Sequence, residues 1–111
     1  MVLVTGATGF IGNHVARVLA ARGEALRALV RPTSKLDLLA DVPGIETCVG
    51  DLCDRASLDR AVKGCSMLFH VAADYRFDVA DKQQMHRSNV EGTRAILEAA
   101  GQAGVARIVY T

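Results

Sequence analysis

The stretch MVLVTGATGFIG, residues 1–12, decides the fold. The apolar run Met1–Thr5 is typical of a buried strand, and it leads through Gly6, Gly9 and Gly12 into a helical pattern. Glycines at a strand-to-helix junction let the backbone approach a diphosphate closely, and the helix N-terminus adds free N–H groups and a positive dipole end. The stretch therefore predicts a dinucleotide-binding βαβ unit, with a ligand-free glycine-rich turn as the alternative.

Strand and helix patterns alternate along the rest of the chain. We expect strands at Met1–Thr5, Ala25–Val30, Ile45–Val49, Ser66–Ala73 and Arg107–Thr111. We expect helices at Phe10–Arg22 (inward Ile11, Val15, Val18, Leu19), Ala56–Lys63 (inward Leu58, Ala61, Val62) and Gln83–Gly101, with a weak helical turn at Lys35–Ala40. This alternation predicts an α/β fold, a Rossmann-type doubly wound parallel sheet with strand order 3-2-1-4-5. The ligand crevice would lie where strands one and four meet.

The pattern stops after the fifth expected strand, Arg107–Thr111, with no helix behind it. A sheet that ends in this way has an unpaired edge and a partly bare face. We therefore expect residues 1–111 to be the incomplete N-terminal portion of a larger protein.

Composition narrows the class of protein. The 111 residues are 50% hydrophobic with a net charge of +1, which suits one folded domain and predicts no nucleic-acid partner. Cys48, Cys53 and Cys65 lack metal-site spacing, so we expect no metal and read them as buried or half-buried residues of a reducing cytoplasm. We expect no membrane span and no secretion signal.

The end of the second strand distinguishes the two nicotinamide dinucleotides. A carboxylate at this point would accept hydrogen bonds from an unphosphorylated ribose. The chain instead has Arg31, Ser34 and Lys35, with no carboxylate before Asp37. Arginine can form a paired contact with a 2′-phosphate, so NADP(H) is favoured and NAD(H) remains open. The alternatives are an exposed basic turn and an arginine stacked on adenine.

Residues after the next strands complete the candidate site. Asp51 can accept from the adenine amino group with the Leu52 backbone alongside, although aspartate is also a common turn residue. The small pair Ala72-Ala73 leaves room for ribose and diphosphate, or packs beneath a helix. Asn89 lies mid-helix on an inward stripe and needs polar partners. His70 in a core strand is expected to be a packed residue.

Four motifs resemble one known family. Thr5–Gly12, Gly50–Leu52, His70–Ala73 and Asn89–Thr93 are similar to those of the extended short-chain dehydrogenase/reductases. Within that group the chain resembles the dihydroflavonol reductase-like branch, and Val71–Arg76 and Ala106–Thr111 are similar to the hopanoid-associated sugar epimerases. The resemblance implies a set of cofactor-binding residues, to which we add Thr8, Phe10 and Ile11 of the glycine motif and Ser34 and Lys35 of the basic turn. The set is Gly6, Thr8, Gly9, Phe10, Ile11, Gly12, Arg31, Ser34, Lys35, Asp51, Leu52, Ala72 and Ala73, with Asn89 in a structural or proton-relay role.

The resemblance also implies an activity that this stretch cannot complete. The family moves hydride between nicotinamide and a secondary alcohol or ketone, here expected to be sugar-like or dihydroflavonol-like, with a Tyr-x-x-x-Lys pair. That pair and the substrate-binding region would follow Thr111, so we expect no catalytic residue in the chain beyond Asn89, and no turnover by it alone. A non-catalytic NADP(H)-binding redox sensor or scaffold is the alternative. The Gln83–Gly101 helix would form part of a homodimer in the parent enzyme.

Overall fold

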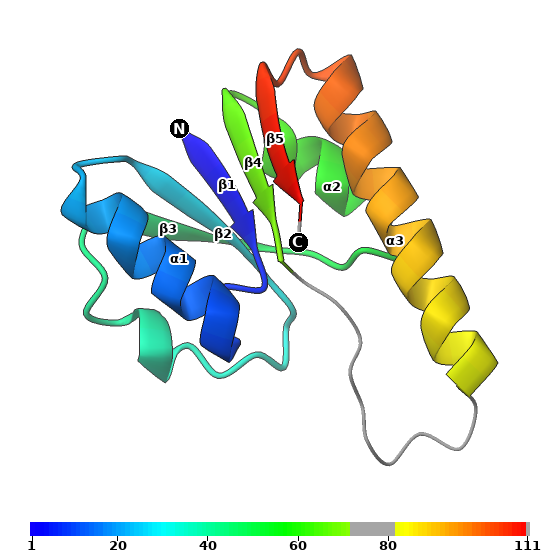
Figure 1. The fold of residues 1–111 in the computed structure, drawn as a ribbon, viewed down its shortest axis with the longest axis horizontal. Coiled ribbons are helices and arrows are strands. Elements are labelled where there is room, and N and C mark those ends of the chain that lie inside the picture. Colours follow the sequence, from blue (N-terminus) through cyan, green and yellow to red (C-terminus); the bar gives the residue numbers. More distant parts are fainter. Residues whose placement is uncertain (72–81, 111) are drawn as a thin grey trace.

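The structure of the chain is a computed structural model that describes residues 1–71 and 82–110, and describes side chains in the second range from residue 89 onward. Within these residues, five strands and three α-helices alternate, with one short 3₁₀ helix between them (Figure 1). The elements in chain order are β1 Val2–Thr5, α1 Phe10–Ala21, β2 Leu26–Val30, η1 Asp37–Leu39, β3 Ile45–Val49, α2 Arg55–Val62, β4 Met67–His70, α3 Lys82–Gln102 and β5 Arg107–Tyr110.

The five strands form one sheet in the order β3-β2-β1-β4-β5, and every neighbouring pair is parallel. The predicted order is therefore confirmed. All four residues of β1 are buried, because the strand is central and both faces of the sheet are covered there. The point where the order reverses lies between β1 and β4, as expected for a doubly wound sheet.

Two hydrophobic cores lie on opposite faces of the sheet. On one face α1 packs over β1 and β2, with Ala16 and Leu19 directed at Val2 and Val4. On the other face α2 and α3 pack together, and Leu58 and Ile96 join the same core as Leu3 and Leu68. Figure 1 shows α1 on one side of the strands and α2 with α3 on the other. The inward positions predicted for α2 (Leu58, Ala61, Val62) are confirmed.

The inward face of α1 agrees with the prediction only in part, because Leu19 is buried and Val15 packs against the core but Ile11 and Val18 do not. Ile11 and Val18 are 60% and 41% exposed, whereas Gly12, Ala16 and Leu19 are buried. Small residues allow the helix to lie close to the glycine loop, and that close approach turns the larger residues outward. Hydrophobic spacing alone did not distinguish the two stripes, since both repeat every three or four residues.

Other differences concern element ends and one cysteine. β4 ends at His70, and Ala72 and Ala73 of its predicted extension lie outside the described residues. Cys48 is half-buried and Cys65 buried as expected, but Cys53 is exposed because it lies in the loop before α2. The helical turn expected at 35–40 is the shorter η1. In the described part of the chain, no helix is long and apolar enough to cross a bilayer.

Candidate functional site

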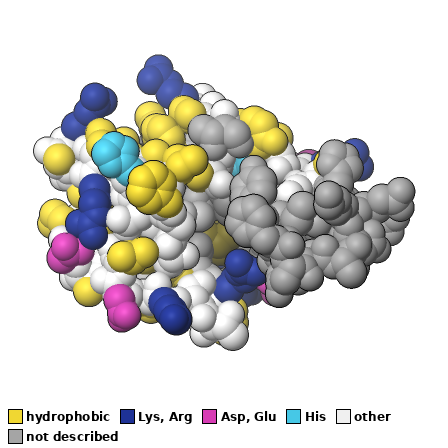
Figure 2. All heavy atoms as spheres, turned by 60° about the horizontal axis from the view of Figure 1, so that its bottom comes forward, with side chains coloured by type: hydrophobic (Ala, Val, Ile, Leu, Met, Phe, Trp, Pro, Cys, Tyr) yellow, Lys and Arg dark blue, Asp and Glu magenta, His cyan; other side chains and the backbone are white. Residues whose placement is uncertain are grey.

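The strand register aligns several loops at one edge of the sheet. Thr5 pairs with Leu29 on one side and with His70 on the other, and Val30 pairs with Val49. The loops that follow β1, β2 and β3 therefore leave the sheet at the same edge, which is the lower end in Figure 1. Figure 2 turns this end forward and shows hydrophobic side chains on it, with basic side chains and fewer acidic ones spread among them. The carboxyl edge of a doubly wound sheet is where such folds bind ligands.

The three glycines of the first loop have three different structural roles. Gly6 has a φ of 76°, a left-handed conformation that glycine adopts without strain. A Cβ added at Gly12 would lie 1.9 Å from the carbonyl oxygen of Gly6, so only hydrogen fits there. A Cβ at Gly9 would meet the same oxygen at 3.4 Å, and Gly9 is exposed. The loop backbone therefore demands glycine at two of the three positions, and at Gly9 it leaves one face open.

The N-terminus of α1 points its free amides at this open face. Gly9 is the N-cap residue, and no side chain caps the helix. Among the described residues, none accepts a hydrogen bond from the amides of Phe10, Ile11 or Gly12. These N–H groups and the positive end of the helix dipole form a binding surface for an anion. The Phe10 side chain is 93% exposed and leaves the surface uncovered.

The turn after β2, residues 31–35 and called the basic turn below, is internally hydrogen-bonded. The Arg31 amide donates to Ser34 Oγ at 2.9 Å, and the Ser34 amide donates to the Arg31 carbonyl at 3.0 Å. The Arg31 and Lys35 side chains are exposed. Ser34 thus acts on the backbone of the turn, a role that the sequence prediction did not include, while the two cations remain available to a ligand.

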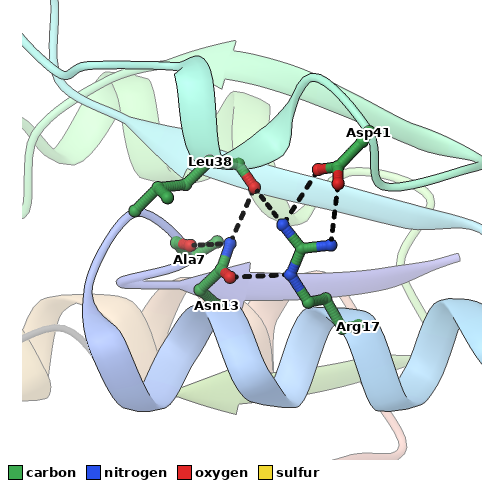
Figure 3. A network of polar contacts seen from close by, with 5 residues as sticks. All are labelled: Ala7, Asn13, Arg17, Leu38 and Asp41. Atoms are coloured by element: carbon green, nitrogen blue, oxygen red, sulfur yellow. Dashed lines mark hydrogen bonds and ion pairs between the residues drawn. The ribbon is translucent and has the colours of Figure 1, made fainter.

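A polar network joins α1 to the glycine loop and to the segment around η1, and sequence reasoning missed it (Figure 3). Asn13 Nδ2 donates to the carbonyls of Ala7 at 3.3 Å and Leu38 at 2.9 Å. Arg17 donates through Nε to Asn13 Oδ1 at 2.9 Å, and through a terminal nitrogen to the Leu38 carbonyl at 3.0 Å. Its two terminal nitrogens also contact both carboxylate oxygens of Asp41, at 2.9 and 3.3 Å. Asn13 and Arg17 are four residues apart on one helix face, which was the available signal.

The loop after β3 is shaped by a buried hydroxyl. Ser57 Oγ accepts from the Asp51 amide at 3.0 Å and lies 2.7 Å from the Asp54 carbonyl, to which it can donate. The Asp51 carboxylate accepts from the Cys53 amide at 2.8 Å, so it caps a turn with one oxygen. A Cβ at Gly92 of α3 would lie 3.0 Å from Leu52, which shows how closely this loop packs on α3. Asp51 therefore stabilises the turn, and its side chain is nevertheless exposed.

A buried histidine connects the ends of β1 and β4. His70 is 1% exposed, with Nδ1 2.8 Å from Thr5 Oγ1 and Nε2 3.1 Å from Thr93 Oγ1. The same Thr5 oxygen accepts from the Val71 amide at 3.0 Å, and the His70 ring stacks on Tyr110 at 5.7 Å between ring centroids. The prediction of a packed histidine is confirmed. Burial lowers the pKa of His70 below its ordinary value, because the charged ring would lose its hydration.

We expect this histidine to make stability depend on pH. The unfolded chain binds a proton at His70 near pH 6.5, whereas the folded chain does so only at lower pH. The stability that follows from keeping His70 uncharged is therefore fully present above about pH 6.5, and it is lost as the pH falls toward the lowered folded pKa. In urea unfolding between pH 5 and 8, the free energy of unfolding should fall less toward low pH in His70→Gln than in wild type. The control His14→Gln changes an exposed histidine and should keep the wild-type decline. Equal slopes in all three proteins would contradict the interpretation.

The site thus contains most of the predicted residues. The structure brings the glycine loop, the Arg31–Lys35 turn and Asp51 with Leu52 to one edge of the sheet. Asn89 is half-buried on α3 and has polar interactions. Ala72 and Ala73 cannot be placed, since they lie outside the described residues. In the described ranges, no group of three or more potential ligand side chains could hold a metal ion.

Comparisons with known proteins agree with this geometry. Residues 2–111 match the model of the NAD dependent epimerase/dehydratase family. A Synechocystis sp. protein provisionally named dihydroflavonol 4-reductase is 48% identical over 108 residues, 97% of this chain and 31% of the relative. The crystal structure of gox2253 is 55% identical with a TM-score of 0.92, over 99% of this chain and 33% of that one. An Agrobacterium tumefaciens short-chain dehydrogenase/reductase superfamily protein with bound NAD is 38% identical with a TM-score of 0.79, over 99% of this chain and 31% of that one. The chain therefore spans about a third of the length of these relatives.

Proposed function

Because this chain belongs to the NAD dependent epimerase/dehydratase family, we propose that its glycine loop holds the diphosphate of NADP(H) or NAD(H). The observation that carries the proposal is the close approach at Gly12, where a Cβ would lie 1.9 Å from the Gly6 carbonyl oxygen. It brings α1 against the loop, so that the uncapped amides of the first turn face the same open side as Gly9. Amides held in this way bind a diphosphate without any charged side chain.

The residues around the loop suit the rest of such a dinucleotide. Thr8, Phe10 and Ile11 would flank the diphosphate, and Asp51 with Leu52 would lie beside the adenine. Asp51 keeps an exposed carboxylate, and Leu52 is fixed by its packing on α3. Ala72 and Ala73 are proposed for the nicotinamide-side ribose on sequence grounds, and Asn89 for a supporting role.

We propose that NADP(H) is preferred over NAD(H). The support is the turn after β2, where Arg31 and Lys35 are exposed and no carboxylate precedes Asp37. The hydrogen bonds between Arg31 and Ser34 hold the turn backbone and leave the guanidinium free to pair with a 2′-phosphate. The NAD bound to the Agrobacterium relative keeps the unphosphorylated cofactor as the competing candidate.

Titration of the full-length protein with NADPH and NADH tests this preference. In Arg31→Ala we expect NADPH affinity to fall by about 10- to 100-fold, because a charge-assisted, two-pronged contact to phosphate is lost. NADH affinity should change less than about twofold, since NADH lacks that phosphate. ATP serves as a control ligand that shares the adenosine but not the dinucleotide. Wild-type preference for NADH, or an equal loss for both cofactors, would contradict the assignment of Arg31.

We propose that the chain is the N-terminal cofactor-binding part of a reductase or epimerase. Its support is the family match together with the coverage of only about a third of each relative. Bound nicotinamide supplies the hydride donor or acceptor for a secondary alcohol or ketone, with a sugar-like or dihydroflavonol-like substrate held by a C-terminal region. The Tyr-x-x-x-Lys pair would come from the same region, so turnover by residues 1–111 alone would contradict the proposal.

We propose that the full-length enzyme forms a homodimer through α3, and the support is the outer surface of this helix. Val90 and Leu97 are both exposed and lie seven residues apart, so they share one helix face. Exposed apolar residues in such a row are typical of helix–helix contacts between subunits. A reducing cytoplasm stays our prediction for the location, and the three free cysteines are its support.

A further inference from the structure

The network of Asn13, Arg17 and Asp41 joins two parts of the site that are far apart in sequence. The amide orientation of Asn13 follows from its partner, because the Arg17 guanidinium can only donate and so faces Oδ1. The Nδ2 group of Asn13 is then left to donate to Ala7 in the glycine loop and to Leu38 at η1. One side chain thus links the loop proposed for the diphosphate to the segment that follows β2.

The network also fixes the segment that follows the basic turn on its C-terminal side. The turn begins at the end of β2, where the Gly50 amide donates to the Val30 carbonyl at 2.8 Å. Eight residues after Val30, Leu38 is held by Asn13 and Arg17. The ion pair of Arg17 with Asp41 adds a second attachment three residues further on, and Arg17 lowers the pKa of Asp41, so that the carboxylate stays charged. Residues 31–37 are therefore tied at both ends.

We propose that the Asn13–Arg17–Asp41 network is a positioning device that sets the preference between NADP(H) and NAD(H). It acts through Arg31 and Lys35, which it holds in a narrow range of positions beside the glycine loop, and touches no cofactor atom itself. Fixing a binding segment in advance lowers the entropy lost on binding, so the benefit falls on whichever ligand uses that segment. This inference rests on the proposed function, since it assumes that the basic turn meets a 2′-phosphate.

The expected effect separates the two cofactors. NADPH uses both the glycine loop and the basic turn, whereas NADH uses the glycine loop without the phosphate contact. In Asn13→Leu, which keeps the side-chain size and removes all three hydrogen bonds, we expect NADPH affinity to fall about tenfold. NADH affinity should fall less than about threefold, because NADH loses only the support that Asn13 gives the glycine loop through its hydrogen bond to Ala7. Arg17→Lys keeps the charge opposite Asp41 but loses the paired geometry, so it should lie between wild type and Asn13→Leu.

A matched control is available on the other face of the sheet. Arg55 is 35% exposed, close to the 40% of Arg17, and joins α2 to α3 through Asp59, Glu98 and Gln102. Among the described residues, its side chain makes no hydrogen bond to the three loops of the site. Arg55→Met should therefore leave the NADPH-to-NADH affinity ratio of the full-length protein unchanged, even if it lowers the melting temperature as much as Asn13→Leu does.

A double-mutant cycle tests whether the network acts through the basic turn. Dissociation constants for NADPH and NADH are measured for wild type, Asn13→Leu, Arg31→Ala and the double variant of the full-length protein. With Arg31 already absent, we expect Asn13→Leu to change the affinity ratio less than about twofold, because only Lys35 then remains for the network to position. The same tenfold change in both backgrounds, or no change in the ratio for Asn13→Leu, would overturn the inference. Binding of neither cofactor by wild type would instead overturn the proposed function itself.

Discussion

Gly12→Ala is expected to lower the free energy of unfolding by about 3 kcal/mol or more and NADPH affinity by at least ~100-fold. The added Cβ would lie 1.9 Å from the Gly6 carbonyl oxygen and 2.5 Å from its carbon, both of which are backbone atoms. No side chain can rotate to relieve this contact, so α1 must move away from the glycine loop. That movement separates the first-turn amides from the loop and weakens the binding surface that both provide.

Another helical glycine in the chain provides the control. Gly101 lies in α3, and a Cβ there would meet nothing within 4 Å. Gly101→Ala should therefore be neutral or stabilise the protein by roughly 0.5–1 kcal/mol, because alanine loses less backbone entropy in a helix. Denaturant unfolding of the two variants measures the difference. Equal stability of Gly12→Ala and wild type would show that α1 and the loop are not in close contact.

The sequence predicted the fold well, because its strongest signals were local. The run Met1–Thr5, the alternation of strand and helix patterns and the short loops were enough for the parallel order 3-2-1-4-5, which the structure confirms. The face of α1 could not be predicted in the same way. Its orientation depends on the approach of Gly12 to Gly6, a contact between backbones, and this leaves Ile11 and Val18 exposed.

The candidate site was predicted less completely than the fold. The glycine spacing and the position of Arg31 after a strand are sequence features, so the residues could be named in advance. The contacts that fix the loops could not be named in advance, because Asn13 contacts Leu38 across 25 positions of sequence and Arg17 contacts Asp41 across 24. Such pairings depend on how α1 lies over the sheet, which follows only from the packed structure.

Gly9→Val should separate ligand binding from folding more clearly than any other change in the loop. Gly9 is exposed and has an ordinary extended conformation, with φ −88° and ψ 171°, so valine can adopt its backbone geometry. A Cβ there meets only the Gly6 carbonyl oxygen, at 3.4 Å. The new side chain would add bulk at the exposed N-cap of α1, where the proposed diphosphate would lie. We therefore expect a folded protein, with unfolding free energy within about 1 kcal/mol of wild type, that has lost its diphosphate site.

Calorimetric titration of full-length Gly9→Val with NADPH, beside wild type, tests most directly whether main-chain amides at the start of α1 bind the cofactor. We expect wild type to bind NADPH and the folded variant to bind it at least ~100-fold more weakly, because a bulky group displaces the diphosphate from its hydrogen-bond donors. NADH should be lost to a similar degree, since it carries the same diphosphate. Unchanged NADPH affinity in a folded Gly9→Val protein would contradict the account.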